Sequence, residues 1–190
     1  MKLVVGITGA SGAIFGIRTL EALRALDVET HLVMSQWARS TIAHETASTL
    51  EQVENLASAV YHPDNQAAAI SSGSYKTDGM IVAPCSMKTL ASIRMGLGDT
   101  LLTRAADVTL KERRKLVLLV RESPFSEIHL DNMLALARMG VVIFPPIPAF
   151  YNKPASVNDV VNHIVGRLLD QFGLDMSGVK RWLGFEGKNE

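Results

Sequence analysis

The residues best suited to chemistry near the start of the chain form a short turn, Gly9-Ala-Ser-Gly12. This turn follows an apolar, β-branched run at residues 2–8 and opens a helical pattern at residues 13–26. Such a turn leaves backbone N–H groups at the start of a helix, where they and the helix dipole attract anions. Two glycines around one serine favour a phosphate or nucleotide site over an ordinary tight turn. The spacing differs from Gly-x-Gly-x-x-Gly, so it does not predict a dinucleotide fingerprint.

Similar polar residues follow the other apolar runs of the chain. They are Ser35, the run Cys85-Ser-Met-Lys-Thr89, the pair Arg121-Glu122 and the aromatic Tyr151. Ligands of open parallel sheets bind beyond the carboxyl ends of the strands, which is where these residues are expected to gather. Arg121-Glu122 directly follows an all-apolar run, which favours a functional role. Lys88 and the charged run at 111–115 fit a phosphate contact or a solvated helix face equally well.

Histidine and cysteine give little support to metal or thiol chemistry. The five histidines show no metal-ligand spacing, and His44, His129 and His163 fall within helical patterns, as surface or packing residues do. Cys85 is the only cysteine and has no nearby histidine to activate it. We therefore expect Cys85 to be a small buried hydrophobe, and we expect neither a metal site nor a disulfide framework.

Apolar runs alternate with helical patterns along the chain, which predicts right-handed βαβ units. Strands are expected at residues 2–8, 29–34, 78–83, 115–120 and 141–144. Helices are expected at residues 13–26, 36–46, 50–59, 90–95, 100–111, 126–139 and 156–172, and an irregular excursion at 61–74. The pattern predicts an α/β fold, a single Rossmann-like or flavodoxin-like three-layer domain with a parallel, doubly wound sheet. That domain is expected to span residues 1–175, with residues 176–190 as a C-terminal tail.

The overall composition narrows the class of protein further. The 190 residues carry 19 basic and 19 acidic side chains, and this balance argues against a nucleic-acid binder, which normally has a basic surplus. Zero net charge also removes a repulsion that opposes self-association. No run is long and apolar enough to span a membrane, and the first residues form a strand pattern instead of a secretory leader. These features predict a cytoplasmic protein.

Five motifs occur together in this sequence. They are Gly-Ile-Thr-Gly-Ala-Ser-Gly at 6–12, Pro-Cys-Ser-Met-Lys-Thr-Leu at 84–90, Arg-Ala-Ala-Asp-Val-x-Leu-Lys-Glu-Arg-Arg at 104–114, Arg-Glu-Ser-Pro-Phe at 121–125 and Pro-Ala-Phe-Tyr at 148–151. As a set they resemble the UbiX-type flavin prenyltransferases, formerly described as aromatic acid decarboxylases, over residues 2–182. The Pro-x-Met-Asn-x-x-Met-Trp signature and early histidine of the related cysteine decarboxylases are absent from the sequence.

The resemblance implies that a dimethylallyl group passes from dimethylallyl monophosphate to N5 and then C6 of reduced FMN. It implies FMN contacts from Gly9, Ala10, Ser11, Ser35, Ser86, Met87, Lys88, Thr89 and Arg121, with Arg104 reaching the site across a subunit contact. It also implies that Tyr151 and Arg167 hold the dimethylallyl phosphate, with Lys111 and Glu122 at the same phosphate. Ser11 and Glu45 match residues near the reacting flavin edge, and Trp182 matches an aromatic near the prenyl group.

The same resemblance carries expectations about partners. It implies a homo-oligomer, expected as a dodecamer with sites at subunit interfaces, that supplies prenylated FMN to a UbiD-type decarboxylase. No metal is expected, because side chains can neutralise a monophosphate leaving group. Two alternatives stay open: an FMN-dependent decarboxylase of an aromatic or cysteine-derived acid, and a non-catalytic FMN carrier. A simple carrier would not need Lys111, Glu122, Tyr151 and Arg167.

Overall fold

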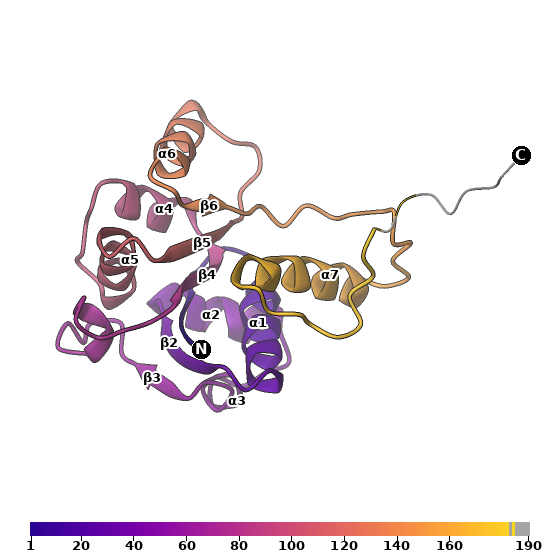
Figure 1. Cartoon of the computed structure of the whole chain (residues 1–190), viewed down its shortest axis with the longest axis horizontal. Coiled ribbons are helices and arrows are strands. Elements are labelled where there is room, and N and C mark those ends of the chain that lie inside the picture. Colours follow the sequence, from indigo (N-terminus) through magenta and orange to yellow (C-terminus); the bar gives the residue numbers. More distant parts are fainter. Residues whose placement is uncertain (183, 185–190) are drawn as a thin grey trace, which may run out of the picture.

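A computed structural model of the chain describes residues 1–182 and 184 and contains a six-stranded parallel sheet. The strand order is β3-β2-β1-β4-β5-β6, the order of a doubly wound fold (Figure 1). The strands are β1 (Lys2–Ile7), β2 (Glu29–Met34), β3 (Ala59–Tyr61), β4 (Gly79–Cys85), β5 (Lys115–Val120) and β6 (Val142–Ile143). The expected α/β class is confirmed.

Helices cover both faces of the sheet and give the molecule three layers. One face packs against α1 (Ala13–Ala25), α2 (Gln36–Glu45), α3 (Leu50–Glu54) and α7 (Val157–Leu169). The other packs against α4 (Met87–Arg94), α5 (Leu101–Lys111) and α6 (Glu127–Arg138). Side chains alternate along β1, so Leu3 and Val5 join the first core and Val4 the second. No helix in the described part of the chain combines the length and apolar character that a bilayer crossing needs.

The structure corrects two of the expected elements. The helix expected at 50–59 ends at Glu54, and the chain then forms β3, an edge strand paired with β2. Two reciprocal hydrogen bonds support this pairing: Thr30 N donates to Ser58 Oγ (3.0 Å), and Ser58 N donates to Thr30 Oγ1 (3.1 Å). The helix expected to begin at residue 90 begins at Met87, because Ser86 caps it. The excursion at 61–74 is irregular, as expected, apart from a short 3₁₀ helix at Ala69–Ser71.

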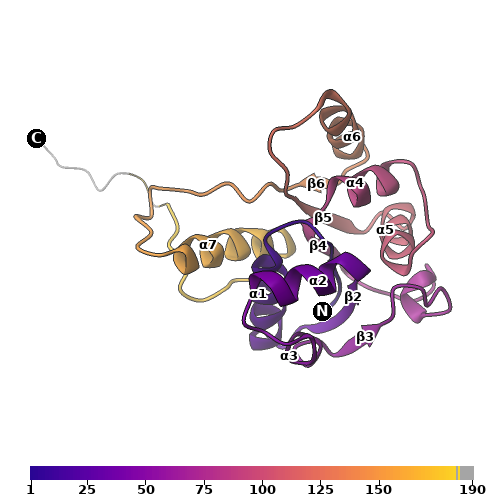
Figure 2. The same cartoon turned by 180° about the vertical axis from the view of Figure 1, so that it is seen from behind.

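The chain after β6 leaves the sheet and returns to it. A proline-rich segment at 145–154 runs away from β6, and α7 comes back to pack on α1 (Figures 1 and 2). A 3₁₀ turn at Asp170–Phe172 follows, and the chain then folds back along α7. Part of the expected tail at 176–190 lies outside the described residues, namely positions 183 and 185–190.

Candidate active site

A hydroxyl-rich cleft lies beyond the carboxyl ends of β1, β2 and β4. Ser35 caps α2, with its Oγ accepting from Ala38 N (3.2 Å). Ser86 caps α4, with its Oγ accepting from Thr89 N (3.3 Å) and donating to Thr89 Oγ1 (3.1 Å). Both caps line one cavity of about 120 Å³, which Gly9 and Lys88 also line. These two helix N-termini therefore open on the same space, an arrangement that suits an anion. Thr100, the N-cap of α5, also lines the cavity, as does Asp99, whose carboxylate opposes an anion.

A larger cavity of about 460 Å³ includes Ser35 and Lys88. Its apolar lining comes from Trp37, Pro63 and Leu102. Trp37, at the start of α2, is 73% exposed. The sequence analysis did not predict these three residues, because it looked for polar and charged groups at strand ends and these side chains are apolar.

Thr8 fixes the position of Ser86. Its buried hydroxyl donates to Pro84 O (2.7 Å) and accepts from Ser86 N (2.9 Å). The end of β1 thereby holds the start of α4 across 78 residues of sequence. Only the strand pairing brings these residues together, so the sequence pattern indicated no role for Thr8 beyond the end of a strand.

The first turn differs from its expected form. Gly12 has φ +99°, a left-handed conformation that favours glycine. The amides of Gly12 and Ala13 are not free for an external anion: both donate to Glu45 Oε2, at 2.8 and 3.1 Å. The helix start therefore does bind an anion, but that anion is a carboxylate from the end of α2. The open helix N-termini are those at Ser35 and Ser86.

Glu45 is held in its ionised form. Partial burial disfavours the charged carboxylate, but hydrogen bonds from the Ser11 hydroxyl and from the two amides outweigh it and lower the pKa of Glu45. The charge of Arg121 acts in the same direction. Ser11, Glu45 and Arg121, three of the expected site residues, are therefore neighbours.

Arg121 and Glu122 directly follow β5, as expected, and are exposed. Arg121 N donates to Cys85 O (3.2 Å), which joins the ends of β5 and β4. Glu122 Oε1 accepts from Ser123 N (3.0 Å). Both side chains therefore stand at the edge of the sheet where β1 and β4 end.

A second pocket gathers the expected donor-binding residues. Tyr151, Arg167 and Trp182 line a cavity of about 560 Å³ between the proline-rich segment and α7. The rings of Tyr151 and Trp182 meet edge to face, with centroids 5.5 Å apart. Arg167 Nη1 donates to Asp170 Oδ2 (3.0 Å), and Asp170 also receives both Nη atoms of Arg181. The pocket combines aromatic walls with cationic groups, as a prenyl phosphate would require.

Lys111 and Arg104 line none of the three cavities described above. Lys111 ends α5, just before β5 begins, so it lies at the amino ends of the strands, on the edge opposite Ser35 and Ser86. Its Nζ donates to Glu112 Oε1 (2.5 Å). Arg104 donates to Ser71 O (3.1 Å) and to Asp107 Oδ2 (2.6 Å). A single copy of the chain therefore keeps Lys111 at the other edge of the sheet, and it pairs Arg104 with Ser71 and Asp107.

Neither the cysteine nor the metal-ligating residue types add a further site. Cys85 is fully buried at the end of β4, as expected, and burial raises the pKa of its thiol far above the ordinary value. Within residues 1–182 and 184, no three histidine, cysteine or acidic side chains cluster as metal ligands would.

The fold and the hydroxyl-rich cleft define a flavin-binding class of protein. Residues 1–169 match the family model described as Flavoprotein. The chain belongs to this family, among its UbiX-like flavin prenyltransferases. It is 65% identical over 186 residues to the probable UbiX-like flavin prenyltransferase of Bacillus subtilis, covering 98% of this chain and 91% of that protein.

Two solved structures share the whole fold. One is a dodecameric FMN-dependent UbiX-like decarboxylase from Escherichia coli O157:H7, with TM-score 0.96 and 60% identity, covering 97% of this chain and 100% of that chain. The other is AnUbiX in complex with FMN and dimethylallyl pyrophosphate, with TM-score 0.96 and 56% identity, covering 97% of this chain and 98% of that chain. The family resemblance expected from the five motifs is confirmed.

Proposed function

We propose that this chain transfers a dimethylallyl group from dimethylallyl monophosphate to N5 and C6 of reduced FMN and so makes prenylated FMN. The observation that carries the proposal is a pair of unlike cavities in a chain of this family. One is a hydroxyl cleft at two helix N-termini, and the other is an aromatic, cationic pocket around Tyr151. A transfer between two phosphate-bearing molecules needs both.

The donor set of the cleft fits the phosphate end of FMN. Ser35, Ser86 and Thr89 provide hydroxyls at two helix starts, and Lys88 adds a positive charge. The proposed flavin contacts continue through Gly9, Ala10, Ser11 and Met87 to Arg121. The proposed FMN-binding domain spans residues 1–175, and the tail from residue 176 contributes Trp182 to the donor pocket.

Tyr151 and Arg167 hold the phosphate of the prenyl donor in this proposal. Lys111 joins that phosphate from a neighbouring copy, because its own copy holds it at the opposite edge of the sheet. Arg104 reaches the FMN site across the same kind of subunit contact. The surface suits such an assembly: α6 exposes Ile128, Leu130 and Leu134, and Ile128 is 72% exposed. We propose a dodecamer, the assembly of the E. coli relative.

The chain's own groups support each part of the transfer. When bound, reduced FMN supplies the nucleophilic N5 and C6 positions. As the allylic C–O bond breaks, the electron pair leaves with the phosphate, and Arg121, Arg167 and Lys111 neutralise that charge. Bonding at N5 and at C6 would each release one proton and the prenyl alkene would take one up, so one proton would leave with the phosphate; Glu122 would relay these protons. Tyr151 and Trp182 form apolar walls that exclude water.

The product has a proposed destination. Prenylated FMN would pass to a UbiD-type decarboxylase in the cytoplasm, and no metal, nucleic acid or membrane takes part in the proposed reaction.

The experiment is to incubate the purified protein with reduced FMN and either dimethylallyl monophosphate or the diphosphate, and to weigh the flavin by mass spectrometry. The diphosphate is included because AnUbiX was solved with dimethylallyl pyrophosphate. We expect the flavin mass to rise by one C₅H₈ unit with the monophosphate. An unchanged flavin mass with both donors would contradict the proposal.

The same samples test the alternatives. The E. coli relative is described as a decarboxylase, so this protein alone should also be tested for carbon dioxide release from an aromatic acid. Release would support the decarboxylase, whereas tight FMN binding without either reaction would support the carrier.

A further inference from the structure

A buried histidine beside the donor pocket has no role so far. His163 lies on α7, is 8% exposed and precedes Arg167 by one helical turn, so both side chains lie on the same face of the helix. Its Nε2 is 2.9 Å from the hydroxyl oxygen of Tyr151, and the two rings meet edge to face with centroids 5.5 Å apart. The sequence analysis expected His163 to be a surface or packing residue. It is buried, and it also makes a directed hydrogen bond.

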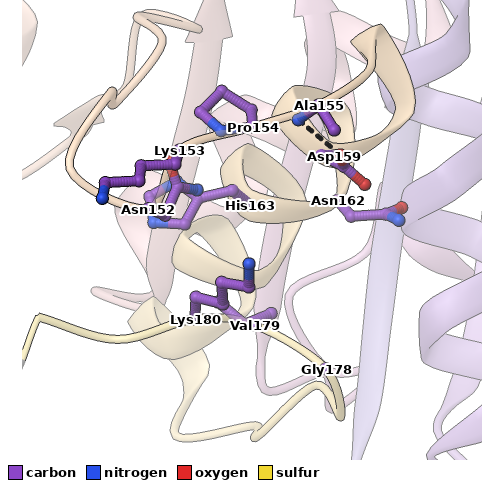
Figure 3. Close-up of a pocket in the computed structure, with 10 residues that line it drawn as sticks. All are labelled: Asn152, Lys153, Pro154, Ala155, Asp159, Asn162, His163, Gly178, Val179 and Lys180. Carbon is purple, nitrogen blue, oxygen red and sulfur yellow. Dashed lines mark hydrogen bonds between the residues drawn. The ribbon is translucent and has the colours of Figure 1, made fainter.

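This hydrogen bond joins two separate elements. Figure 3 draws the small cavity on the other side of His163, where Asn152 and Lys153 of the proline-rich segment lie next to α7. Tyr151 comes from that same segment, so His163 fixes the phenol relative to α7 and therefore relative to Arg167. The junction between the segment and α7 is held separately by Asp159, which accepts from Ala155 N (2.9 Å) and Ser156 N (3.0 Å).

The imidazole is kept neutral by its surroundings. Burial lowers the pKa of His163, the positive charges of Arg167 and Arg181 lower it further, and Asp170 opposes them. A neutral imidazole carries one hydrogen, on Nδ1 or on Nε2. An ionised phosphate offers only acceptors, so its binding selects the form in which Nε2–H donates to Tyr151 and the phenol O–H donates to the phosphate.

We propose that His163 is a positioning residue: it donates from Nε2 to the Tyr151 oxygen and thereby points the phenol hydrogen at the phosphate of the prenyl donor. This inference rests on the proposed function, in which Tyr151 and Arg167 hold that phosphate. It adds a specificity element that recognises the anionic end of the donor and leaves the flavin site untouched.

The test measures binding as well as turnover. Dimethylallyl monophosphate is titrated by calorimetry into protein loaded with oxidised FMN, which lacks the electrons for the reaction. His163→Leu removes the hydrogen bond and should weaken donor binding and raise its KM about tenfold, with kcat less affected. His163→Gln retains an amide N–H where Nε2 stood and should recover most of the loss.

A double-mutant cycle separates positioning from simple packing. Tyr151→Phe removes the phenol, so His163→Leu should have little further effect on donor binding in that background. Asp159→Ala is the matched control, because it loosens the same segment from the same helix without touching Tyr151. It should leave donor affinity within about twofold of wild type.

The outcomes distinguish the two proposals. A wild type that binds no donor and makes no prenylated FMN overturns the proposed function, and this inference with it. If the wild type binds the donor and makes prenylated FMN, and His163→Leu binds the donor equally well, only the role of His163 is overturned. That role is also overturned if the effects of His163→Leu and Tyr151→Phe add, or if Asp159→Ala weakens binding as much.

Discussion

At the scale of single residues, two hydrogen-bonding side chains set the shape of the flavin-facing loops. Glu45 closes the start of α1, and Thr8 ties the end of β1 to the start of α4. Neither needs to touch a ligand to matter, because each fixes backbone groups that line the cleft. Their effects can therefore be separated into stability and binding.

Thr8→Val tests the tie at the start of α4. The variant keeps the shape of the side chain but leaves Ser86 N without its acceptor, while Pro84 O keeps only the backbone N–H of Thr8 (3.2 Å). Unfolding in urea should show a loss of about 1–3 kcal/mol. Fluorescence titration should show weaker FMN binding as well, since Ser86 lines the cleft.

Thr109→Val is the control for Thr8→Val. Its buried hydroxyl donates only to Ala105 O of its own helix (2.7 Å), away from the cleft. It should affect stability without changing FMN affinity. Equal FMN affinities for the Thr8 variant and wild type would show that Thr8 supports the fold alone.

Glu45→Gln tests the internal anion at α1. The folded-state pKa of Glu45 lies below its ordinary value of 4.5, so its contribution is present above that pH and is lost as the pH falls through the folded value. The variant should lose about 1 kcal/mol of unfolding free energy at pH 7. The gap should narrow as the pH falls below 4.5, where the unfolded chain takes up the proton, and close once the pH is below the lower pKa of the folded carboxyl. A gap that stays constant with pH would mean that the charge is not its source.

At the scale of secondary-structure elements, the tail and α7 fit together through a glycine. A Cβ on Gly166 would lie 2.3 Å from Val179 Cγ2, so the tail approaches the helix where no side chain intervenes. Arg181 adds ion pairs to Asp170 and Asp175. This docking brings Trp182 to Tyr151 and thereby completes the pocket proposed for the prenyl donor.

Gly166→Ala should displace the tail without unfolding the domain. Alanine favours the helix by up to about 1 kcal/mol, so global stability should not fall, but its methyl group must push Val179 away. Trp182 fluorescence, measured in a Trp37→Phe background, should shift towards that of a solvent-exposed indole. Adding Val179→Ala makes room for the methyl group and should restore the signal. Unchanged fluorescence in the single variant would mean that the tail absorbs the methyl group in place.

The observed elements show which parts of the fold the sequence could predict. Long apolar runs and capping residues such as Ser35 and Ser156 predicted five of the six strands and most helices, because those signals are local. β3 has only three residues and depends on pairing with β2, so the local sequence did not predict it. The bonds between Thr8 and Ser86 and between Tyr151 and His163 likewise arise from tertiary structure. Residue types therefore gave candidate site residues, whereas only the tertiary structure gives their hydrogen-bond partners.

At the scale of the whole molecule, one chain holds an incomplete set of proposed site residues. Tyr151 and Arg167 share a pocket, whereas Lys111 lies at the opposite edge of the sheet. If Lys111 acts on the same phosphate, it must come from another copy. Function then depends on assembly as much as on folding.

Mixed oligomers test this dependence. Lys111→Ala and Tyr151→Phe should each reduce prenylated FMN formation strongly when expressed alone. When the two variants are co-expressed with different tags and purified as hybrids, about a quarter of the sites should combine both wild-type residues from different copies. Hybrid activity well above that of either parent is the expected result. Hybrids no more active than the parents would place both residues in the same copy or remove Lys111 from the reaction.

The buried Cys85 has a practical consequence. It lies in the core beneath α4, α5 and α6, at the end of the inner strand β4, and its thiol stays protonated because burial raises its pKa. A thiol reagent can reach it only when the central strands separate. As the only cysteine in the chain, it is a built-in reporter. Its rate of labelling measures how often the sheet opens. A ligand that binds across the strand ends should slow that rate by the factor 1 + L/Kd, where L is the free ligand concentration.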